Sequence, residues 1–428
     1  MNIAYVKYTG QKEVLKRTRL SSADYDGTVK EILTQVQNRG DAAVREYTER
    51  FDQVKLSELE VGQEEIQEAI SRVGSRFMEI LNRAKERIVE YHSMQKRNSL
   101  LKTEANGSMT GLLILPLERV GVYVPGGKAL YPSSVLMNVL PAKVAGVGEV
   151  IMVSPPGPDG RLDDKILAAA SVCGVDRVFK MGGAQAIGAL AYGTESVPRV
   201  DKIVGPGNIF VATAKKLVYG EVNVDSIAGP SEILVLADET ANPQYVAADL
   251  LSQAEHDELA GAILITDSES LADAVKKELE VQTAAAPRRA IIEAALANRG
   301  MILLTQNLEE GIVLANEYAP EHMEICTREP MSLVPKIRNA GAIFVGNYSP
   351  EPMGDYMAGP NHVLPTGGTA RFFSPLNVDD FIKKTSLLYM SRESLRKLGP
   401  DVVEFAQAEQ LFAHGNAVKL RLEEMERE

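Results

Sequence analysis

Residues 119–154 read RVGVYVPGGKALYPSSVLMNVLPAKVAGVGEVIMVS, and this stretch determines the fold that we expect. It opens and closes with short runs rich in β-branched residues, RVGVYV and EVIMVS. The residues between them have the apolar composition of a helix. A strand, a helix and a second strand at this spacing are typical of a βαβ unit, in which the two strands lie parallel in one sheet.

The same alternation continues along the chain on both sides of a break at Gly229-Pro230. Further strand-like runs, separated by helical stretches, occur at 177–181, 201–204, 232–237, 261–266, 301–305 and 341–346. We therefore expect an α/β fold with two sheets of parallel strands. The first hundred residues read as amphipathic helices, which we expect to pack against the second sheet.

The C-terminal part of the chain is irregular before it becomes helical. Residues 346–370 contain 5 Gly and 4 Pro, and a loop of this length in a compact chain is usually functional or disordered. A second break is expected at Gly399-Pro400, followed by one terminal helix from Asp401 to about Glu424.

The composition is that of an ordinary globular protein and argues against several classes. With 46 basic and 58 acidic residues, the formal charge is 46 − 58 = −12, which disfavours binding to duplex nucleic acid. Two cysteines, Cys173 and Cys326, cannot form a disulfide framework for a chain of 428 residues. The N-terminus lacks the apolar run of a signal peptide, and no segment is long enough to span a membrane. We therefore expect a cytoplasmic protein that binds neither nucleic acid nor membrane.

Glycine-rich loops lie at 123–134, 181–188, 204–210 and 227–232. Three of them follow a strand and precede a helix, which places them at the carboxyl edge of the first sheet, where open parallel sheets bind ligands. Glycine allows the backbone to approach a phosphate, and helix N-termini supply free N–H groups. GPGNIF at 205–210 is the nearest match to the dinucleotide fingerprint GxGxxG, but it lacks the third glycine. Tight turns that hold no ligand are the alternative.

A metal site is indicated by Gln253 and His256. Asn242 as a cap and Pro243 in the first turn predict a helix that carries both residues on one face. An amide oxygen beside an imidazole suits a cation such as Zn²⁺ or Mn²⁺. A partly buried polar pair at a helix interface is the alternative.

Glu321 and His322 are candidates for proton transfer. They follow Pro320 at the apparent start of a short strand, where adjacent side chains point to opposite sides. Histidine titrates near neutral pH and burial can raise the pKa of a glutamate, so the two residues could serve two proton transfers around one substrate. A dipeptide without a chemical role is the alternative.

The remaining candidates lie in the loop at 346–370 and in the tail. Asp355 in the loop is a candidate oxygen ligand, and His362 lies in the same loop. Glu409 and His414 are five residues apart in the expected terminal helix, which separates them by about 140°. Because they do not share a helix face, a solvated helix end is the alternative.

Two further residues are interpreted as structural. His92 lies late on an amphipathic helix and has no partner motif. Cys326 follows Glu321 and His322 closely enough to be considered as a nucleophile, but no nucleophile motif surrounds it, and a buried packing role is the commoner one.

Several long motifs, in order, resemble the histidinol dehydrogenase family. The most specific are SQAEHDE at 252–258, APEHMEI at 319–325 and GDYMAGPNHVLPTGGTARF at 354–372. The resemblance begins near residue 20 and includes RVGVYVPGG, GGAQAIGALAYGT, VGPGN, AGPSEILVLAD, LNVDDFIKKTS and AEQLFAHGNAV. It implies oxidation of the small molecule L-histidinol to L-histidine, the last step of histidine biosynthesis. The family uses two NAD⁺ in succession and holds an aldehyde on the enzyme.

The resemblance also implies roles for individual residues of this chain. Zinc, one ion per subunit, would be held by Gln253, His256, Asp355 and His414. Glu321 and His322 would be the catalytic acid/base pair, and Tyr123, Gln185 and Asn208 would contact NAD. The substrate would lie against Ser231, His362, Glu409, His322 and the four zinc ligands.

For the architecture, the resemblance implies two incomplete Rossmann-like parallel-sheet domains with N-terminal helices and a C-terminal helical tail. We expect an α/β domain of 21–118 with 233–372 that carries most metal and acid/base residues, an NAD-binding domain of 119–232, and small dimerisation or tail segments of 1–20 with 373–428. The family forms an intertwined homodimer in which the C-terminal segment reaches the partner's site.

The residue types of this chain are also compatible with two other functions. A zinc-dependent hydrolase of a small polar substrate would use the same residue types, but no HExxH-type motif occurs. A metal- or nucleotide-binding module without catalysis is the third interpretation.

Overall fold

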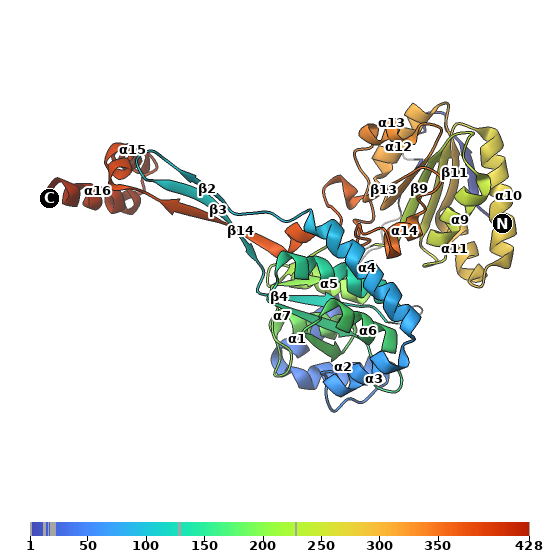
Figure 1. Ribbon diagram of the computed structural model, residues 1–428, viewed down its shortest axis with the longest axis horizontal. Coiled ribbons are helices and arrows are strands. Elements are labelled where there is room, and N and C mark those ends of the chain that lie inside the picture. The colour runs from blue at the N-terminus through green and yellow to red at the C-terminus, as the bar shows by residue number, and fades with distance from the viewer. Residues whose placement is uncertain are drawn as a thin grey trace. The chain divides into compact units, whose positions relative to one another are not determined.

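A computed structural model describes residues 2–11, 14, 15, 17, 23–126, 130–226 and 229–427. By internal contacts the chain divides into two compact units (Figure 1). The first unit comprises Met1–Gln95 with Leu117–Phe381, and the second comprises Lys96–Pro116 with Ile382–Glu428. Each unit is described by itself below.

One sheet of the first unit has five parallel strands in the order β6-β5-β4-β7-β8. Its strands are β4 (Arg119–Tyr123), β5 (Glu149–Ser154), β6 (Arg177–Lys180), β7 (Lys202–Val204) and β8 (Asn223–Val224). The connecting helices are α5 (Pro132–Ala145), α6 (Asp164–Cys173), α7 (Gly183–Tyr192) and α8 (Ile209–Val218). Successive residues of β5 enter two different apolar cores, Val150 and Met152 one and Ile151 and Val153 the other, so both faces of the sheet are covered.

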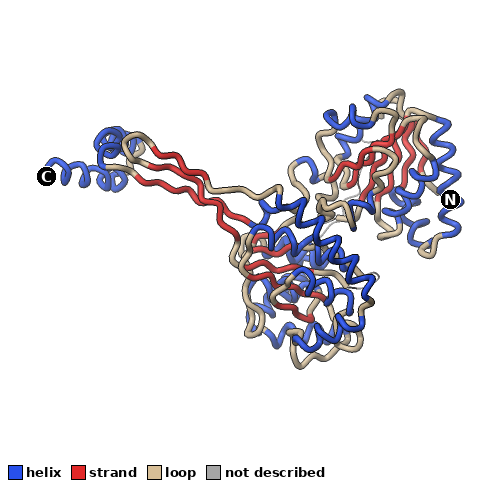
Figure 2. The backbone as a smooth tube through the Cα atoms, in the orientation of Figure 1, coloured by secondary structure: helices blue, strands red, loops and turns tan. Residues whose placement is uncertain are grey.

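The other sheet of the first unit has six parallel strands in the order β1-β11-β10-β9-β12-β13. Its strands are β1 (Ala4–Lys7), β9 (Glu232–Ala237), β10 (Gly261–Thr266), β11 (Gly300–Leu304), β12 (His322–Cys326) and β13 (Ala342–Val345). Its helices are α9 (Pro243–Ala254), α10 (Glu269–Ala285), α11 (Arg289–Arg299), α12 (Leu308–Tyr318), α13 (Pro330–Leu333) and α14 (Glu351–Tyr356). Figure 2 shows helices flanking the strands, and the expectation of an α/β fold with two parallel sheets is confirmed.

The N-terminal helices belong to the five-stranded sheet, which corrects the expectation that they pack against the other one. They are α1 (Ala23–Arg39), α2 (Asp41–Asp52), α3 (Gln63–Arg72) and α4 (Ser75–Ser93). The apolar face of α1 lies in the same core as Ile151 and Phe179, and α4 shares the other core with α5 and α6 (Figure 1). The reason for the difference is that helical spacing reveals an apolar face without revealing which surface covers it.

The second unit is a three-stranded antiparallel sheet followed by two helices. The sheet order is β14-β3-β2, formed by β14 (Ile382–Tyr389), β3 (Met109–Pro116) and β2 (Leu100–Thr103). The helices are α15 (Arg392–Ala408) and α16 (Phe412–Arg427). The expected single helix from Asp401 is therefore corrected: Pro400 lies inside α15, and the chain turns at Gln410, whose φ is 62°.

The three-part division predicted from sequence stays a prediction, although its tail segment shares 382–428 with the second unit. Among the helices that the structure describes, none is both long and apolar enough to cross a membrane.

Candidate functional site

The two residues expected to act as an acid/base pair are held by the backbone of one residue, Glu232. Glu321 directly precedes β12, and its Oε2 accepts a hydrogen bond of 2.8 Å from the N–H of Glu232. His322 is the first residue of β12, and its Nδ1 lies 3.0 Å from the carbonyl oxygen of Glu232. The strand register produces this arrangement, because His322 lies opposite Ile233 of β9.

The expectation that the two side chains point to opposite sides is wrong. Oε2 of Glu321 lies 3.7 Å from Nδ1 of His322. The alternation of side chains applies within a strand, and Glu321 lies outside β12.

The hydrogen bond to Glu232 fixes the tautomer of His322. A carbonyl oxygen only accepts, so Nδ1 carries the proton and Nε2 is left as the acceptor. Burial lowers the pKa of His322 to about 4, although the charge of Asp355 opposes this shift. The ring is therefore neutral near pH 7, and Nε2 is able to take a proton.

The pKa of Glu321 moves in the opposite direction. Burial raises the pKa of this carboxyl well above its ordinary value of 4.5, and the hydrogen bond from the Glu232 N–H opposes the rise. A buried carboxyl of raised pKa beside a neutral imidazole is typical of residues that exchange protons with a substrate.

Two further carboxylates, those of Glu351 and Asp355, lie close to His322. One ligand atom from each of His322, Glu351 and Asp355 lies within 4.8 Å of the others. Oε1 of Glu351 is 3.6 Å from Nε2 of His322, and Oδ1 of Asp355 is 3.6 Å from Nδ1 of His362. Both acids are on α14 and four residues apart, which puts them on one face. Burial and the neighbouring Asp355 raise the pKa of Glu351 to about 9.

The chemistry of this cluster fits a divalent cation. Gln253, near the end of α9, is buried, and its Oε1 has no hydrogen-bond partner within the described ranges. The helix carrying it meets α14 where the Ser252 hydroxyl donates to Oε2 of Glu351 at 3.5 Å. An amide oxygen without a donor, two carboxylates and an imidazole are all ligand types that zinc accepts.

His256 lies just beyond α9, which corrects its expected position well inside the helix. The helix ends at Ala254, and the N–H of His256 bonds to the carbonyl of Gln253 at 3.2 Å in the following turn. Asn242 caps the helix and Pro243 occupies its first turn, as expected. His256 lies within electrostatic range of His322 and His362, because its charge would lower the pKa of both.

The other expected substrate residues are distributed over both units. Ser231 directly precedes β9, and its carbonyl accepts a hydrogen bond from the N–H of Gly261 at 2.9 Å. Glu409 caps the C-terminus of α15, and His414 lies in the first turns of α16. Since both belong to the second unit, the cluster of the first unit does not contain them.

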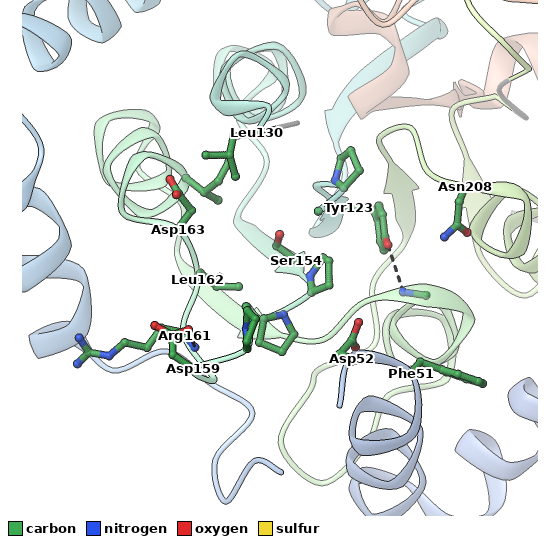
Figure 3. A pocket seen from close by; sticks show the side chains of 18 of the residues that line it. Phe51, Asp52, Tyr123, Leu130, Ser154, Asp159, Arg161, Leu162, Asp163 and Asn208 are labelled. Atoms are coloured by element: carbon green, nitrogen blue, oxygen red, sulfur yellow. Dashed lines mark hydrogen bonds between the residues drawn. The ribbon is translucent and has the colours of Figure 1, made fainter. Parts of the chain in front are cut away.

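A cleft of about 1090 Å³ opens at the carboxyl edge of the five-stranded sheet (Figure 3). Tyr123, Gln185 and Asn208, the residues expected to contact NAD, all line it. The Tyr123 hydroxyl accepts a hydrogen bond from the N–H of Gly183 at 3.1 Å, whereas both amide atoms of Gln185 are buried and have no partner in the described part of the chain. Oδ1 of Asn208 caps α8. The cleft therefore offers at least one unsatisfied polar side chain to a ligand.

The partial fingerprint GPGNIF uses its first glycine for close packing. Gly205 has a φ of 109°, and a Cβ at this position would lie 2.1 Å from the carbonyl oxygen of Tyr123. Only glycine therefore brings the loop after β7 against the end of β4. Parts of the loops at 123–134 and 227–232 lie outside the described residues.

His92 and Cys326 have the environments expected of structural residues. His92 is fully buried, its Nδ1 lies 2.8 Å from Oε1 of Gln95, and burial lowers its pKa. Cys326 is buried in the core between β9 and α9, and burial raises the pKa of its thiol. A thiol of raised pKa is a poor nucleophile.

Glu351 and Arg17 are among the residues of the site that were not identified from the sequence. The sequence could have indicated Glu351, because it stands four residues before the candidate ligand Asp355. It could not have indicated Arg17, because its partner Glu232 is 215 residues away. Its guanidinium pairs with both carboxylate oxygens of Glu232, at 2.6 and 2.7 Å, and lies 3.6 Å from the ring centroid of Tyr318. Arg17 thus supports the residue whose backbone holds Glu321 and His322.

Comparisons with known proteins identify the family that this chain resembles. A family model described as histidinol dehydrogenase matches residues 15–422. A histidinol dehydrogenase of Clostridium acetobutylicum is 54% identical over 406 residues, which cover 95% of this chain and 94% of that protein. One from Geobacter sulfurreducens is 51% identical over 412 residues, 96% of each chain. The crystal structure of histidinol dehydrogenase from Elizabethkingia anophelis superposes with a TM-score of 0.94 at 36% identity and covers 99% of both chains.

Proposed function

The chain belongs to the histidinol dehydrogenase family, and from this premise we propose that it oxidises L-histidinol to L-histidine in two NAD-dependent steps, with the intermediate aldehyde retained on the enzyme. The observation that carries the mechanism is the pairing of a neutral His322, whose Nε2 is free to accept a proton, with a buried Glu321 of raised pKa. NAD⁺ supplies the hydride acceptor for each oxidation.

The two residues divide the proton transfers. His322 takes the proton of the substrate alcohol at Nε2 in the first oxidation. Glu321 then removes a proton from the water that adds to the aldehyde, while protonated His322 returns its proton to the aldehyde oxygen. The neutral His322 that results accepts the proton of the hydrated aldehyde in the second oxidation. Glu321 accepts a hydrogen bond from the N–H of Glu232 and His322 donates one to the carbonyl oxygen of Glu232, and these two bonds keep both side chains in place throughout.

The remaining residues bind and orient. We propose that Gln253, His256, Asp355 and His414 hold one zinc ion, which positions the amine and imidazole of the substrate. Support comes from the unsatisfied Oε1 of Gln253 and from the cluster around Asp355. Ser231, His362 and Glu409 complete the substrate site, and Tyr123, Gln185 and Asn208 bind NAD in the cleft of Figure 3.

The second unit has the exposed apolar surface that a dimer interface requires. Large apolar side chains are exposed on it, among them Leu100, Leu388, Phe405 and Phe412. Exposed apolar surface of this kind marks a protein interface. We propose that these residues dimerise and that Glu409 and His414 enter the site of the neighbouring subunit. We also place the enzyme in the cytoplasm, where its two free thiols stay reduced.

Counting NADH tests the proposal. Protein, histidinol, NAD⁺ and Zn²⁺ are mixed, and we expect two NADH per histidinol consumed. One NADH would mean that the aldehyde is released, and none would favour a zinc hydrolase or a binding module.

Removing the metal tests the zinc assignment. We expect exhaustive chelation to lower turnover sharply, in parallel with the zinc content measured by mass spectrometry, and added Zn²⁺ to restore it. Full activity in protein shown to be free of metal would reject the assignment.

A further inference from the structure

The nucleotide cleft contains a carboxylate that the fold does not use. Asp52 is the last residue of α2 and lines the cleft beside Phe51 (Figure 3). Its Oδ2 is buried and, among the residues described, has no hydrogen-bond partner. Burial raises the pKa of this carboxyl to about 6.

The position of Asp52 is unfavourable for the stability of α2. A negative charge at a helix C-terminus is opposed by the helix dipole, and a buried acceptor without a donor has lost its hydration. A polar group that breaks local rules in this way is typical of a ligand-binding residue.

The sheet topology places Asp52 on the adenosine half of a dinucleotide site. In the order β6-β5-β4-β7-β8, the winding of the sheet reverses between β4 and β7, and a dinucleotide binds across such a point. The chain that follows Asp52 runs beside β6, where the N–H of Val61 bonds to the carbonyl of Val178 at 2.8 Å. Tyr123, the last residue of β4, lies within electrostatic range of Asp52, because burial and the charge of Asp52 both raise its pKa. We therefore assign the end of α2 to the half made of β4, β5 and β6.

A doubly wound nucleotide site usually takes its ribose-binding acid from the end of the second strand. Here that strand is β5, which ends at Ser154 and is followed by Pro155 and Pro156. No acid stands at this point. Farther along the same loop, Asp159 and Asp163 line the cleft, but they already accept hydrogen bonds from the N–H groups of Arg161 and Lys165. Asp52 supplies from α2 a carboxylate oxygen that has no partner among the described residues.

The other charges in the cleft disfavour an additional phosphate. Arg72 pairs with Asp164 at 2.8 Å, and Arg161 pairs with Glu68 at 3.0 Å, so both guanidinium groups already have carboxylate partners. With these two arginines, the formal charge of the residues that line the cleft is 2 − 4 = −2. The four acidic lining residues are Asp52, Asp159, Asp163 and Asp164. A 2′-phosphate would bring roughly two more negative charges into this surface.

We propose that Asp52 determines the nucleotide specificity of the enzyme: its carboxylate accepts hydrogen bonds from the adenosine ribose hydroxyls and repels a 2′-phosphorylated dinucleotide. This inference rests on the proposed NAD-dependent function and adds to it the residue that distinguishes NAD⁺ from NADP⁺. Hydrogen bonds from hydroxyls to a carboxylate are charge-assisted, and they are shorter and stronger than neutral ones.

Binding measurements on the full-length protein test the inference. NAD⁺, NADP⁺, ADP-ribose and nicotinamide mononucleotide are titrated by calorimetry into wild type, Asp52→Asn and the control Glu46→Gln. Glu46 is on the same helix, is exposed and pairs with Arg39, so the control removes the same charge outside the cleft. Thermal unfolding of each ligand-free protein is recorded alongside.

In Asp52→Asn we expect the affinity for NAD⁺ and ADP-ribose to fall about 10-fold, as loss of a hydrogen bond to a charged group predicts. The affinity for NADP⁺ should rise, because the charge that repels the 2′-phosphate is removed, and the affinity for nicotinamide mononucleotide should stay unchanged. Discrimination against NADP⁺ should therefore fall by more than the loss in affinity for NAD⁺. KM for NAD⁺ should rise while kcat at saturating NAD⁺ is retained. The melting temperature should equal or exceed that of wild type, which a structural role of Asp52 would not produce.

The inference is overturned if Asp52→Asn weakens NAD⁺ and NADP⁺ equally, leaves NAD⁺ binding unchanged, or weakens nicotinamide mononucleotide in place of ADP-ribose. If wild type itself neither binds NAD⁺ nor forms NADH, the proposed function fails. If wild type forms NADH and the variant discriminates as wild type does, only the role of Asp52 fails.

Discussion

Replacing Glu321 by Gln separates the two oxidations that we propose. The amide has the size of the carboxyl, and its oxygen can still accept the hydrogen bond from the N–H of Glu232. His322 keeps its own bond to the same residue, so the first oxidation retains its base. The second oxidation loses the group that activates water.

The size of the effect follows from the role assigned to Glu321. General-base catalysis contributes about 10²- to 10⁴-fold, which corresponds to roughly 3–5 kcal/mol of activation free energy. We therefore expect oxidation of histidinal to fall by about 10²-fold or more and the NADH burst from histidinol to fall by less than about 10-fold. Histidinal should accumulate in solution, because its removal becomes slow.

The pH dependence of histidinal oxidation is a second test of the role of Glu321. Glu321 acts as a carboxylate, and burial raises its pKa above 4.5. In wild type the oxidation of histidinal should rise as the pH increases through this raised pKa, and the variant should lose that rise.

The assay follows NADH from histidinol under single-turnover conditions and from histidinal in the steady state. Glu317→Gln serves as a control, because Glu317 is exposed on α12, four residues earlier. If both half-reactions of Glu321→Gln slow by the same factor, the division of labour between Glu321 and His322 is refuted.

Three further variants test the structural roles of single residues. Cys326→Ser should retain turnover, since the thiol is buried and is not a nucleophile. It should lose about 1–3 kcal/mol of unfolding free energy, because a hydroxyl is buried in place of the thiol. Near-complete loss of NADH formation would contradict this prediction. Gly205→Ala should weaken NAD⁺ binding and lower the melting temperature, because its Cβ would overlap the carbonyl oxygen of Tyr123. An unchanged affinity for NAD⁺ in calorimetry would argue against this close packing. His92→Gln should make the unfolding free energy less sensitive to acid between pH 7 and 5. The reason is that the lowered pKa of His92 gives wild type a stability that is lost as the pH falls below 6.5. If the unfolding free energies from denaturant titrations change with pH in parallel for the two proteins, His92 does not titrate as a buried group.

The architecture could be predicted where the sequence alternates strongly. The limits expected for β5, β9 and β10 agree with the structure to the residue, because each is a short apolar run that is buried on both faces. The edge strand β1 and the antiparallel strands of the second unit were not predicted. These strands are partly exposed, and their partners are remote in sequence: Ile382 pairs with Pro116 and Ala4 with Met301.

Candidate site residues were easier to identify than their arrangement. Glu321, His322 and Asp355 stand in specific motifs, but their surroundings depend on the pairing of β9 with β12 and on α14. Glu232 illustrates the limit most clearly. Its side chain contacts Arg17 and its backbone contacts two other residues, and these contacts join three segments that are distant in sequence.

The packing of α1–α4 on the five-stranded sheet has a consequence for synthesis of the protein. These helices emerge from the ribosome before the strands that cover their apolar faces, which begin only at Arg119 and are complete at Val224. At 5–20 residues per second, translation of that interval takes roughly 5–20 s. During this time the nascent chain carries amphipathic helices with uncovered apolar faces, which makes it a target for chaperones that bind such surfaces.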